Sequence, residues 1–178
     1  MDNKAVFLDR DNTLIVDVPY LKDPTQVRLF PETQQELKRL KDNGYYLIVI
    51  SNQSGVARGL CTSDQVEAVN REMERQLEPV VLDAIYISPD GPDNENSLTR
   101  KPAPGMIFQA RDHFHLNLKQ CFMIGDKIID VECGKNAQCK TVHLRRDGLR
   151  ENICGADFVA GDLTETINWI LKQENAEK

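Results

Sequence analysis

Two aspartates separated by one residue follow directly on a short apolar segment. Asp9, Arg10 and Asp11 come after the segment Ala5–Leu8. A short apolar run of this kind predicts a buried strand, and open α/β sheets bind their ligands beyond the carboxyl ends of the strands. One ionised carboxylate there can attack phosphorus, while a second exchanges protons with the leaving alcohol and with water. An isolated Asp-x-Asp pair also fits two solvated turn residues, so the hypothesis depends on the other groups at this edge.

Farther along the chain, two more polar groups could bind phosphate: a serine after a second apolar segment, and an arginine with a lysine. Ser51 follows an apolar segment at residues 46–50, where its hydroxyl, the side-chain amides after it and backbone N–H groups suit phosphate oxygens. Arg100 and Lys101 precede Pro102, and their charges suit a phosphate. Taken separately, the first group is an ordinary turn and the second is a pair of surface charges.

A third carboxylate follows the apolar segment 121–124. Asp126 is placed there to bind Mg²⁺ together with Asp9 and the backbone carbonyl of Asp11, and its alternative role is a helix N-cap. Asp130, one helical turn farther on, is expected as a supporting partner beside the metal or as a helix-start carboxylate. Three ionised carboxylates would repel a phosphate dianion. The mechanism therefore requires both Mg²⁺ and a lysine.

Short apolar runs that alternate with helical patterns must position these groups. This alternation predicts a three-layer, Rossmann-like α/β domain around a central parallel sheet. Strands are expected at residues 5–8, 46–50, 84–87, 121–124 and 140–143, with an edge strand at 156–159. Helices are expected at residues 32–43, from 62 to before Pro79, at 104–114, after 126, and at 163–172. The polar segment 89–99 is expected to be a surface loop.

Length, charge and cysteine content narrow the class of protein. With 178 residues, of which 40% are hydrophobic, the chain has enough material for one core, so we expect a single domain over residues 1–178. A net charge of -6 argues against partners such as nucleic acid or a membrane surface. Five scattered cysteines and a start without a secretory signal indicate a cytoplasmic protein. We expect a monomer whose partner is a small-molecule phosphate ester.

The polar groups together resemble the four motifs of the haloacid dehalogenase superfamily. The matches, in chain order, are Asp9 with Asp11, Ser51, Lys101, and Gly125-Asp126 with Asp130. Segments 51–59 and 100–106 look like those of the D-glycero-D-manno-heptose 1,7-bisphosphate phosphatases, and the related histidinol-phosphate phosphatases share most of them. The resemblance implies the haloacid dehalogenase fold, with strand 1 between strands 2 and 4. It covers most of the chain and leaves no interval for a separate cap domain.

The resemblance also implies an activity and a set of contacts. It implies Mg²⁺-dependent hydrolysis of a small sugar phosphate through a phospho-aspartate on Asp9, with heptose 1,7-bisphosphate as the first expected substrate. Histidinol phosphate or another small metabolite is the alternative substrate, and a phospho-accepting or inactive binding module is the alternative of another class. The catalytic group is Asp9, Asp11, Ser51 and Lys101. The substrate contacts implied by the matches are Asp17, Tyr20, Ser51, Asn52, Gln53, Ser54, Arg100, Lys101 and Lys127.

Two places depart from the pattern of these subfamilies. Asn12 stands where they usually have glycine, and asparagine tolerates left-handed backbone better than most residues. Their structural zinc is bound by three cysteines and a histidine before the Arg-Lys-Pro string. The corresponding segments 88–91 and 97–99 offer no thiolate or imidazole here. We therefore expect no zinc, and a loop held by hydrogen bonds and packing.

Overall fold

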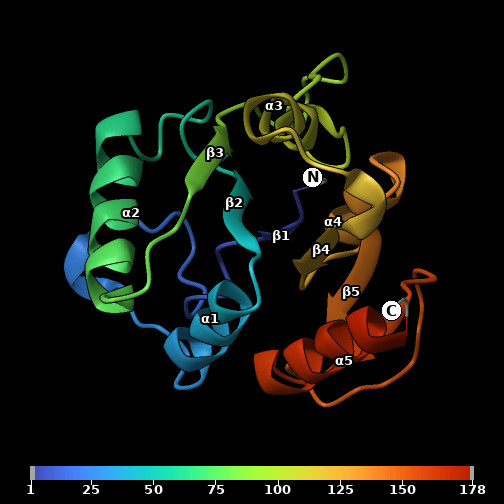
Figure 1. Ribbon diagram of the computed structural model, residues 1–178. Helices are drawn as coiled ribbons and strands as arrows, with labels where there is room; N and C mark the ends of the chain where they lie inside the picture. The colour runs from blue at the N-terminus through green and yellow to red at the C-terminus, as the bar shows by residue number, and fades with distance from the viewer. Residues whose placement is uncertain (1–2, 177–178) are drawn as a thin grey trace.

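Six parallel strands form one sheet in the computed structural model, which describes residues 3–176. Residues 1–2 and 177–178 of the expected domain lie outside that description. The strands are β1 (Ala5–Leu8), β2 (Tyr46–Asn52), β3 (Ala84–Ser88), β4 (Phe122–Gly125), β5 (Lys140–Leu144) and β6 (Phe158–Ala160). They lie in the order β3-β2-β1-β4-β5-β6, and Figure 1 labels the first five of this row. The strand order therefore reverses at β1, as expected, and the crevice of an open sheet forms at such a reversal.

The strands are connected mainly by helices whose positions agree with the apolar periodicity. The helices are α1 (Thr33–Asp42), α2 (Ser63–Leu77), α3 (Gly105–Phe114), α4 (Ile128–Asn136) and α5 (Leu163–Ala176), with short 3-10 helices η1 (Pro24–Gln26) and η2 (Leu118–Gln120). Helix α2 begins with a capping box: the Gln65 N–H donates to Thr62 Oγ1, and the Thr62 N–H donates to Gln65 Oε1. The apolar side of α2, including Val69 and Met73, is buried.

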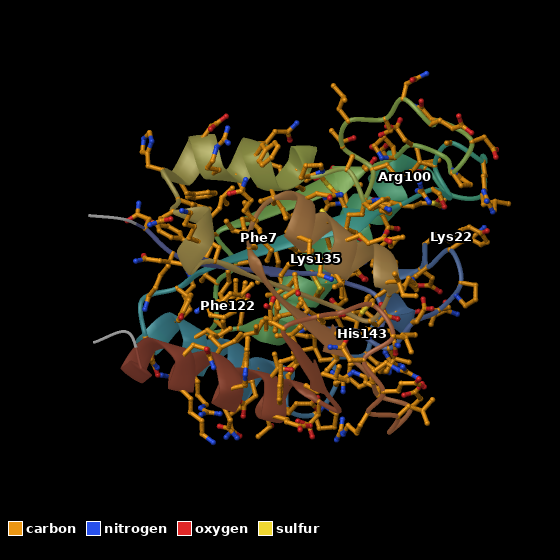
Figure 2. The ribbon with its side chains drawn as sticks, turned by 90° about the vertical axis from the view of Figure 1, so that its right-hand side faces the viewer. Phe7, Lys22, Arg100, Phe122, Lys135 and His143 are labelled. Atoms are coloured by element: carbon orange, nitrogen blue, oxygen red, sulfur yellow. The ribbon has the colours of Figure 1, made fainter. Side chains whose placement is uncertain are left out.

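The alternating side chains of β1 divide the core between two faces of the sheet. Val6 and Leu8 pack with residues of α1, α2 and α5, whereas Ala5 and Phe7 pack with residues of α3 and α4. Figure 1 shows α1 beside α5, and Figure 2 shows Phe7 and Phe122 inside the molecule on opposite sides of the sheet. This is the predicted three-layer arrangement. Because both faces are covered, ligands have access at the strand ends.

The differences from the predicted bounds are small. β2 continues through Ser51 to Asn52, so Ser51 lies inside the strand instead of after it. The edge strand begins at Phe158, two residues later than predicted, and α5 extends past residue 172. The segments between the described strands contain loops and the helices above, so no separate cap domain is inserted there. None of the described helices combines the length and apolar character needed to cross a membrane.

Candidate active site

The predicted chemical groups meet at the carboxyl ends of β1, β2 and β4. The Asp9 N–H donates to the carbonyl of Ile124 at 2.9 Å, which continues the pairing of β1 with β4 by one residue. This bond places Asp9 beside the loop that carries Asp126. Ser51 lies at the end of the neighbouring strand β2 and is buried. The reversal of strand order thus brings three separate motifs to one edge.

Lys101 is a buried cation held between two carboxylates. Its side chain is 2% exposed, and Nζ lies 2.7 Å from Asp9 Oδ1 and 2.6 Å from Asp130 Oδ1. Nζ also donates to the carbonyl of Ile50 at 2.9 Å. Burial by itself lowers the pKa of Lys101, but the charges of Asp130 and Asp9 outweigh this effect and raise the pKa. The lysine is therefore a fixed positive charge beside Asp9.

Asp9, Asp126 and Asp130 form a cluster with the chemistry of a divalent-cation site. One side-chain oxygen from each lies within 4.8 Å of the others. Oδ1 of Asp126 is buried and has no hydrogen-bond partner in the described part of the chain. Burial raises the pKa of Asp126, as does the charge of Asp9. Three ionised carboxylates and Lys101 sum to two negative charges, and all the donors are hard oxygens, so the cluster suits one Mg²⁺ ion.

Asp130 is a helix-start carboxylate, as one reading of its spacing predicted, and it also pairs with Lys101. Its Oδ2 accepts the Lys127 N–H at 3.0 Å and so begins α4, while Oδ1 pairs with Lys101 in the carboxylate cluster. Burial raises the pKa of Asp130 to about 6, although the Lys101 charge acts to lower it. Asp130 packs so closely on Gly125 that a Cβ at Gly125 would lie 2.4 Å from the carboxylate. Glycine at position 125 is therefore needed for the Asp130 contact.

Asp11 lies beside the cluster and accepts hydrogen bonds from two other side chains. Its carboxylate receives Arg10 Nε at 3.2 Å and Nη2 at 3.1 Å, and Gln53 Nε2 at 2.9 Å. Gln53 Nε2 also donates to Ser51 Oγ at 2.8 Å. These donors stabilise the charged carboxylate. Gln53 thereby links the Asp11 carboxylate to the Ser51 hydroxyl.

Arg10 is a site residue whose role the sequence alone did not indicate. Its side chain is 1% exposed, and Nη1 donates to Oδ1 of Asn70, a buried residue of α2, at 2.8 Å. A buried guanidinium requires such partners because an unpaired one is costly. In the sequence, only its position between two site aspartates indicated that Arg10 would be buried. Its partner 60 residues away in the sequence carried no comparable signal.

Comparison with known proteins agrees with this geometry. A model of the HAD-hydrolase-like family matches residues 98–166. D-glycero-beta-D-manno-heptose-1,7-bisphosphate 7-phosphatase of Haemophilus ducreyi is 34% identical over 96% of this chain and 100% of its own. The Salmonella typhi protein of that name is 35% identical, with 96% of each chain covered. The chain belongs to this family of haloacid dehalogenase-like phosphatases. A phosphoric monoester hydrolase is consistent with the carboxylate cluster and its lysine.

A solved structure of a related phosphatase has the same fold as this chain. The D,D-heptose 1.7-bisphosphate phosphatase from B. bronchiseptica, crystallised with magnesium and phosphate, superposes with a TM-score of 0.83. It is 27% identical in sequence, and the match covers 96% of this chain and 99% of that one. The fold of the phosphatase is therefore shared over nearly its full length.

A pocket of about 320 Å³ opens beside Asp11 and collects most of the predicted substrate contacts of the phosphatase. Its lining includes the predicted residues Asp17, Tyr20, Asn52, Gln53, Ser54 and Lys127. Tyr20 has a left-handed φ of 52°, and its hydroxyl accepts a hydrogen bond from Arg58 at 2.7 Å. The Asn52 side chain both donates to the Lys101 carbonyl at 3.0 Å and accepts the Lys101 N–H at 2.9 Å. Asn52 therefore holds the backbone of Lys101.

The loop before Lys101 is held by its own polar groups. Ser88 Oγ lies 3.1 Å from Thr99 Oγ1, and the Ser97 hydroxyl donates to Asp90. The Arg100 N–H donates to Ser97 Oγ at 2.9 Å, and Arg100 Nη1 donates to the Asp90 carbonyl at 2.9 Å. The prediction of a loop stabilised by hydrogen bonds is confirmed. Arg100 is bound to its own loop and is not among the residues that line the pocket beside Asp11.

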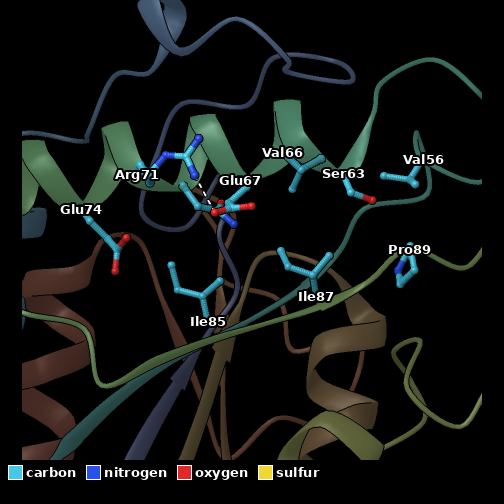
Figure 3. A pocket seen from close by; sticks show the side chains of 10 residues that line it. Val56, Ser63, Val66, Glu67, Arg71, Glu74, Ile85, Ile87 and Pro89 are labelled. Carbon is cyan, nitrogen blue, oxygen red and sulfur yellow. Dashed lines mark hydrogen bonds and ion pairs between the residues drawn. The ribbon is translucent and has the colours of Figure 1, made fainter.

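A larger cavity of about 530 Å³ lies between α2 and the edge strand β3 (Figure 3). Its walls are mainly apolar, with Val66, Ile85 and Ile87 facing one another. The Arg71 side chain there is paired with Glu67, and Glu74 adds a further acidic group. A phosphate would meet no unpaired cation among these lining residues. The smaller pocket, beside the buried lysine and the carboxylates, is therefore the better candidate for phosphate chemistry.

Proposed function

We propose that this phosphatase removes the 7-phosphate of D-glycero-D-manno-heptose 1,7-bisphosphate. The observation that carries the chemistry is the convergence of Asp9, Asp126 and Asp130 on one point, with Lys101 buried among them. The substrate rests on relatives of that activity which are 34% and 35% identical over 96% of the chain. The predicted single domain over residues 1–178, its cytoplasmic location and its monomeric state belong to the same proposal.

Asp9 is the proposed nucleophile. Lys101 occupies its Oδ1, which directs the other carboxylate oxygen toward phosphorus. As the new Asp9 oxygen–phosphorus bond forms, the bond from phosphorus to the alcohol oxygen breaks, and Asp11 gives that oxygen a proton. Asp11 then takes a proton from water, whose oxygen attacks the phospho-aspartate and releases inorganic phosphate and free Asp9. Asp9 is thereby free and Asp11 protonated again after one turnover, with the ester and one water converted to alcohol and inorganic phosphate.

The residues present fit Mg²⁺, which belongs to the proposal as the cofactor. Asp9, Asp126 and the backbone carbonyl of Asp11 would hold it, with Asp130 as a supporting neighbour. When bound, Mg²⁺ supplies positive charge that offsets the charge of the phosphate. Lys101 supplies the remaining cation from the protein.

Phosphate and sugar recognition are assigned to the groups around the pocket. The Ser51 hydroxyl, the backbone N–H groups after it and Lys101 would bind the transferred phosphate. The sugar and its second phosphate would meet Asp17, Tyr20, Asn52, Gln53, Ser54, Arg100 and Lys127. Arg100 Nη1 is held by the Asp90 carbonyl, so the other guanidinium N–H groups of Arg100 would make its contact with substrate.

A substrate panel tests the proposal. Phosphate release is measured with heptose 1,7-bisphosphate, histidinol phosphate and several hexose phosphates in the presence of Mg²⁺. We expect the highest kcat/KM for the heptose bisphosphate. A higher value for histidinol phosphate would transfer the assignment to the alternative substrate. Turnover of none, with stable phosphorylation of the protein, would favour the phospho-accepting module.

Asp9→Asn is the matched control for the panel because it keeps the shape of the side chain and removes the nucleophilic oxygen. Hydrolysis should be undetectable, and beryllium fluoride should protect the wild type and not this variant from thermal unfolding. Phosphate release by Asp9→Asn at the wild-type rate would contradict the covalent route. Metal analysis of the purified protein checks the expected absence of zinc, and one zinc ion per chain would contradict it.

A further inference from the structure

Asn12 touches the proposed metal ligand Asp126 from the loop that follows β1. Its Nδ2 donates to Oδ2 of Asp126 at 3.0 Å, across 114 positions of sequence. The other oxygen, Oδ1, is buried without a hydrogen-bond partner in the described residues. The two oxygens of one carboxylate are thus made unequal by a single neighbouring amide.

We propose that Asn12 is a positioning residue that selects which oxygen of Asp126 faces the divalent cation. An amide N–H₂ group only donates, so it attracts one carboxylate oxygen and leaves the other for a cation. In a buried site the free oxygen is costly unless a cation meets it. The amide therefore sets the Asp126 side chain in the metal-binding orientation before the metal arrives. The inference rests on the metal site of the proposed function.

The backbone of Asp126 is held separately, so the Asn12 amide acts on the side chain alone. The buried His143 lies with Nε2 3.1 Å from the Asp126 carbonyl, and a carbonyl only accepts, so Nε2 carries the donated hydrogen. Two independent contacts thereby fix Asp126, one on the main chain and one on the carboxylate. Removing the amide leaves the main-chain contact in place.

The backbone at Asn12 explains why this residue can have the role. Its φ is 58°, a left-handed conformation in which glycine is the least strained residue and asparagine is tolerated. The Asn12 N–H donates to the Ile15 carbonyl at 2.8 Å, and its carbonyl accepts from Arg146 at 3.2 Å. Glycine would keep both main-chain bonds and lose only the amide. Asn12 therefore makes the turn and adds a donor that glycine lacks.

The test compares metal binding in Asn12→Gly and the wild type without substrate. Mn²⁺ binding is followed by electron paramagnetic resonance, and Mg²⁺ binding by competition. Partners of metal ligands typically contribute about 10–100-fold to affinity, and we expect the Mn²⁺ Kd to rise about 10-fold. The Mg²⁺ concentration that gives half-maximal phosphate release should rise by a similar factor.

Gln138→Gly is the matched control. Gln138 also has a left-handed φ, 62°, an exposed amide side chain, and a place near the amino end of β5, at the opposite end of the sheet. Its replacement should leave the Mn²⁺ Kd unchanged. A Kd for Asn12→Gly within twofold of the wild-type value, in a variant with wild-type circular dichroism, would overturn the role of Asn12. Failure of the wild type itself to bind Mn²⁺ or Mg²⁺ would instead overturn the metal site of the proposed function.

Discussion

Replacing Lys101 by methionine removes a buried charge while keeping a flexible side chain of similar length. The ammonium lies within 2.7 Å of Asp9 and 2.6 Å of Asp130, and the side chain is 2% exposed. Removing one partner of a buried ion pair costs about 3–5 kcal/mol because the remaining charge is left uncompensated. The unfolding free energy of a domain is about 5–15 kcal/mol, so this variant should lose a large share of it. Hydrolysis should fall by about 100-fold or more.

The loss of unfolding free energy in Lys101→Met should depend on pH, because it depends on the charge of Asp130. Burial raises the pKa of this carboxyl to about 6, and the Lys101 charge opposes that rise. Without the lysine the pKa rises further, so the folded protein retains a proton that the unfolded chain releases. A carboxyl with a raised pKa in the folded state contributes stability at low pH that is lost as the pH rises. The deficit of the variant should therefore be larger at about pH 8 than at about pH 5.

Urea unfolding followed by circular dichroism, in EDTA at both pH values, measures these free energies. A double-mutant cycle with Asp130→Asn should give a coupling of about 0.5–3 kcal/mol, because the second change removes the uncompensated charge. Lys38→Met is the control, since Lys38 pairs with Asp42 on the surface and such pairs contribute only about 0–1 kcal/mol. A loss below about 1 kcal/mol in Lys101→Met at the higher pH, or additivity within about 0.5 kcal/mol, would refute the reasoning.

Two further substitutions test the neighbours of the cluster. Asp11→Asn should lower kcat for phosphate release by about 100- to 10,000-fold, because it removes the proton-transfer group and keeps the shape; unchanged turnover would contradict the assignment. The same change removes the charged partner of the buried Arg10, so the unfolding free energy should also fall by about 1–3 kcal/mol. Asn70→Leu removes the acceptor of the buried Arg10 Nη1 and should lower the unfolding free energy by about 1–3 kcal/mol, measured by urea unfolding. A change under about 0.5 kcal/mol would indicate that Arg10 finds another partner.

The fold was predictable because local apolar runs determine where buried parallel strands lie. β1 was predicted at its observed bounds, Ala5–Leu8, because four apolar residues are followed at once by charged ones. β2 was predicted too short, since Ser51 and Asn52 are polar residues that nevertheless continue the pairing with β3. Tertiary pairing extends a strand into residues whose types do not indicate one. At the end of β2, the predicted bound therefore stopped short of the polar site residues.

The meeting of the motifs at one edge was likewise predictable from the sequence. Which polar atoms of these residues are hydrogen-bonded and which are free was not. Parallel strands place Asp9, Ser51 and Asp126 at one edge whatever their side-chain rotamers are. Which oxygen of Asp126 is free depends on Asn12, and whether Asn52 faces substrate depends on the backbone of Lys101. Such contacts connect residues many positions apart, and a side chain's type gives only its donors and acceptors. The sequence thus predicts the chemistry of the site, while the structure decides which polar atoms are free to perform it.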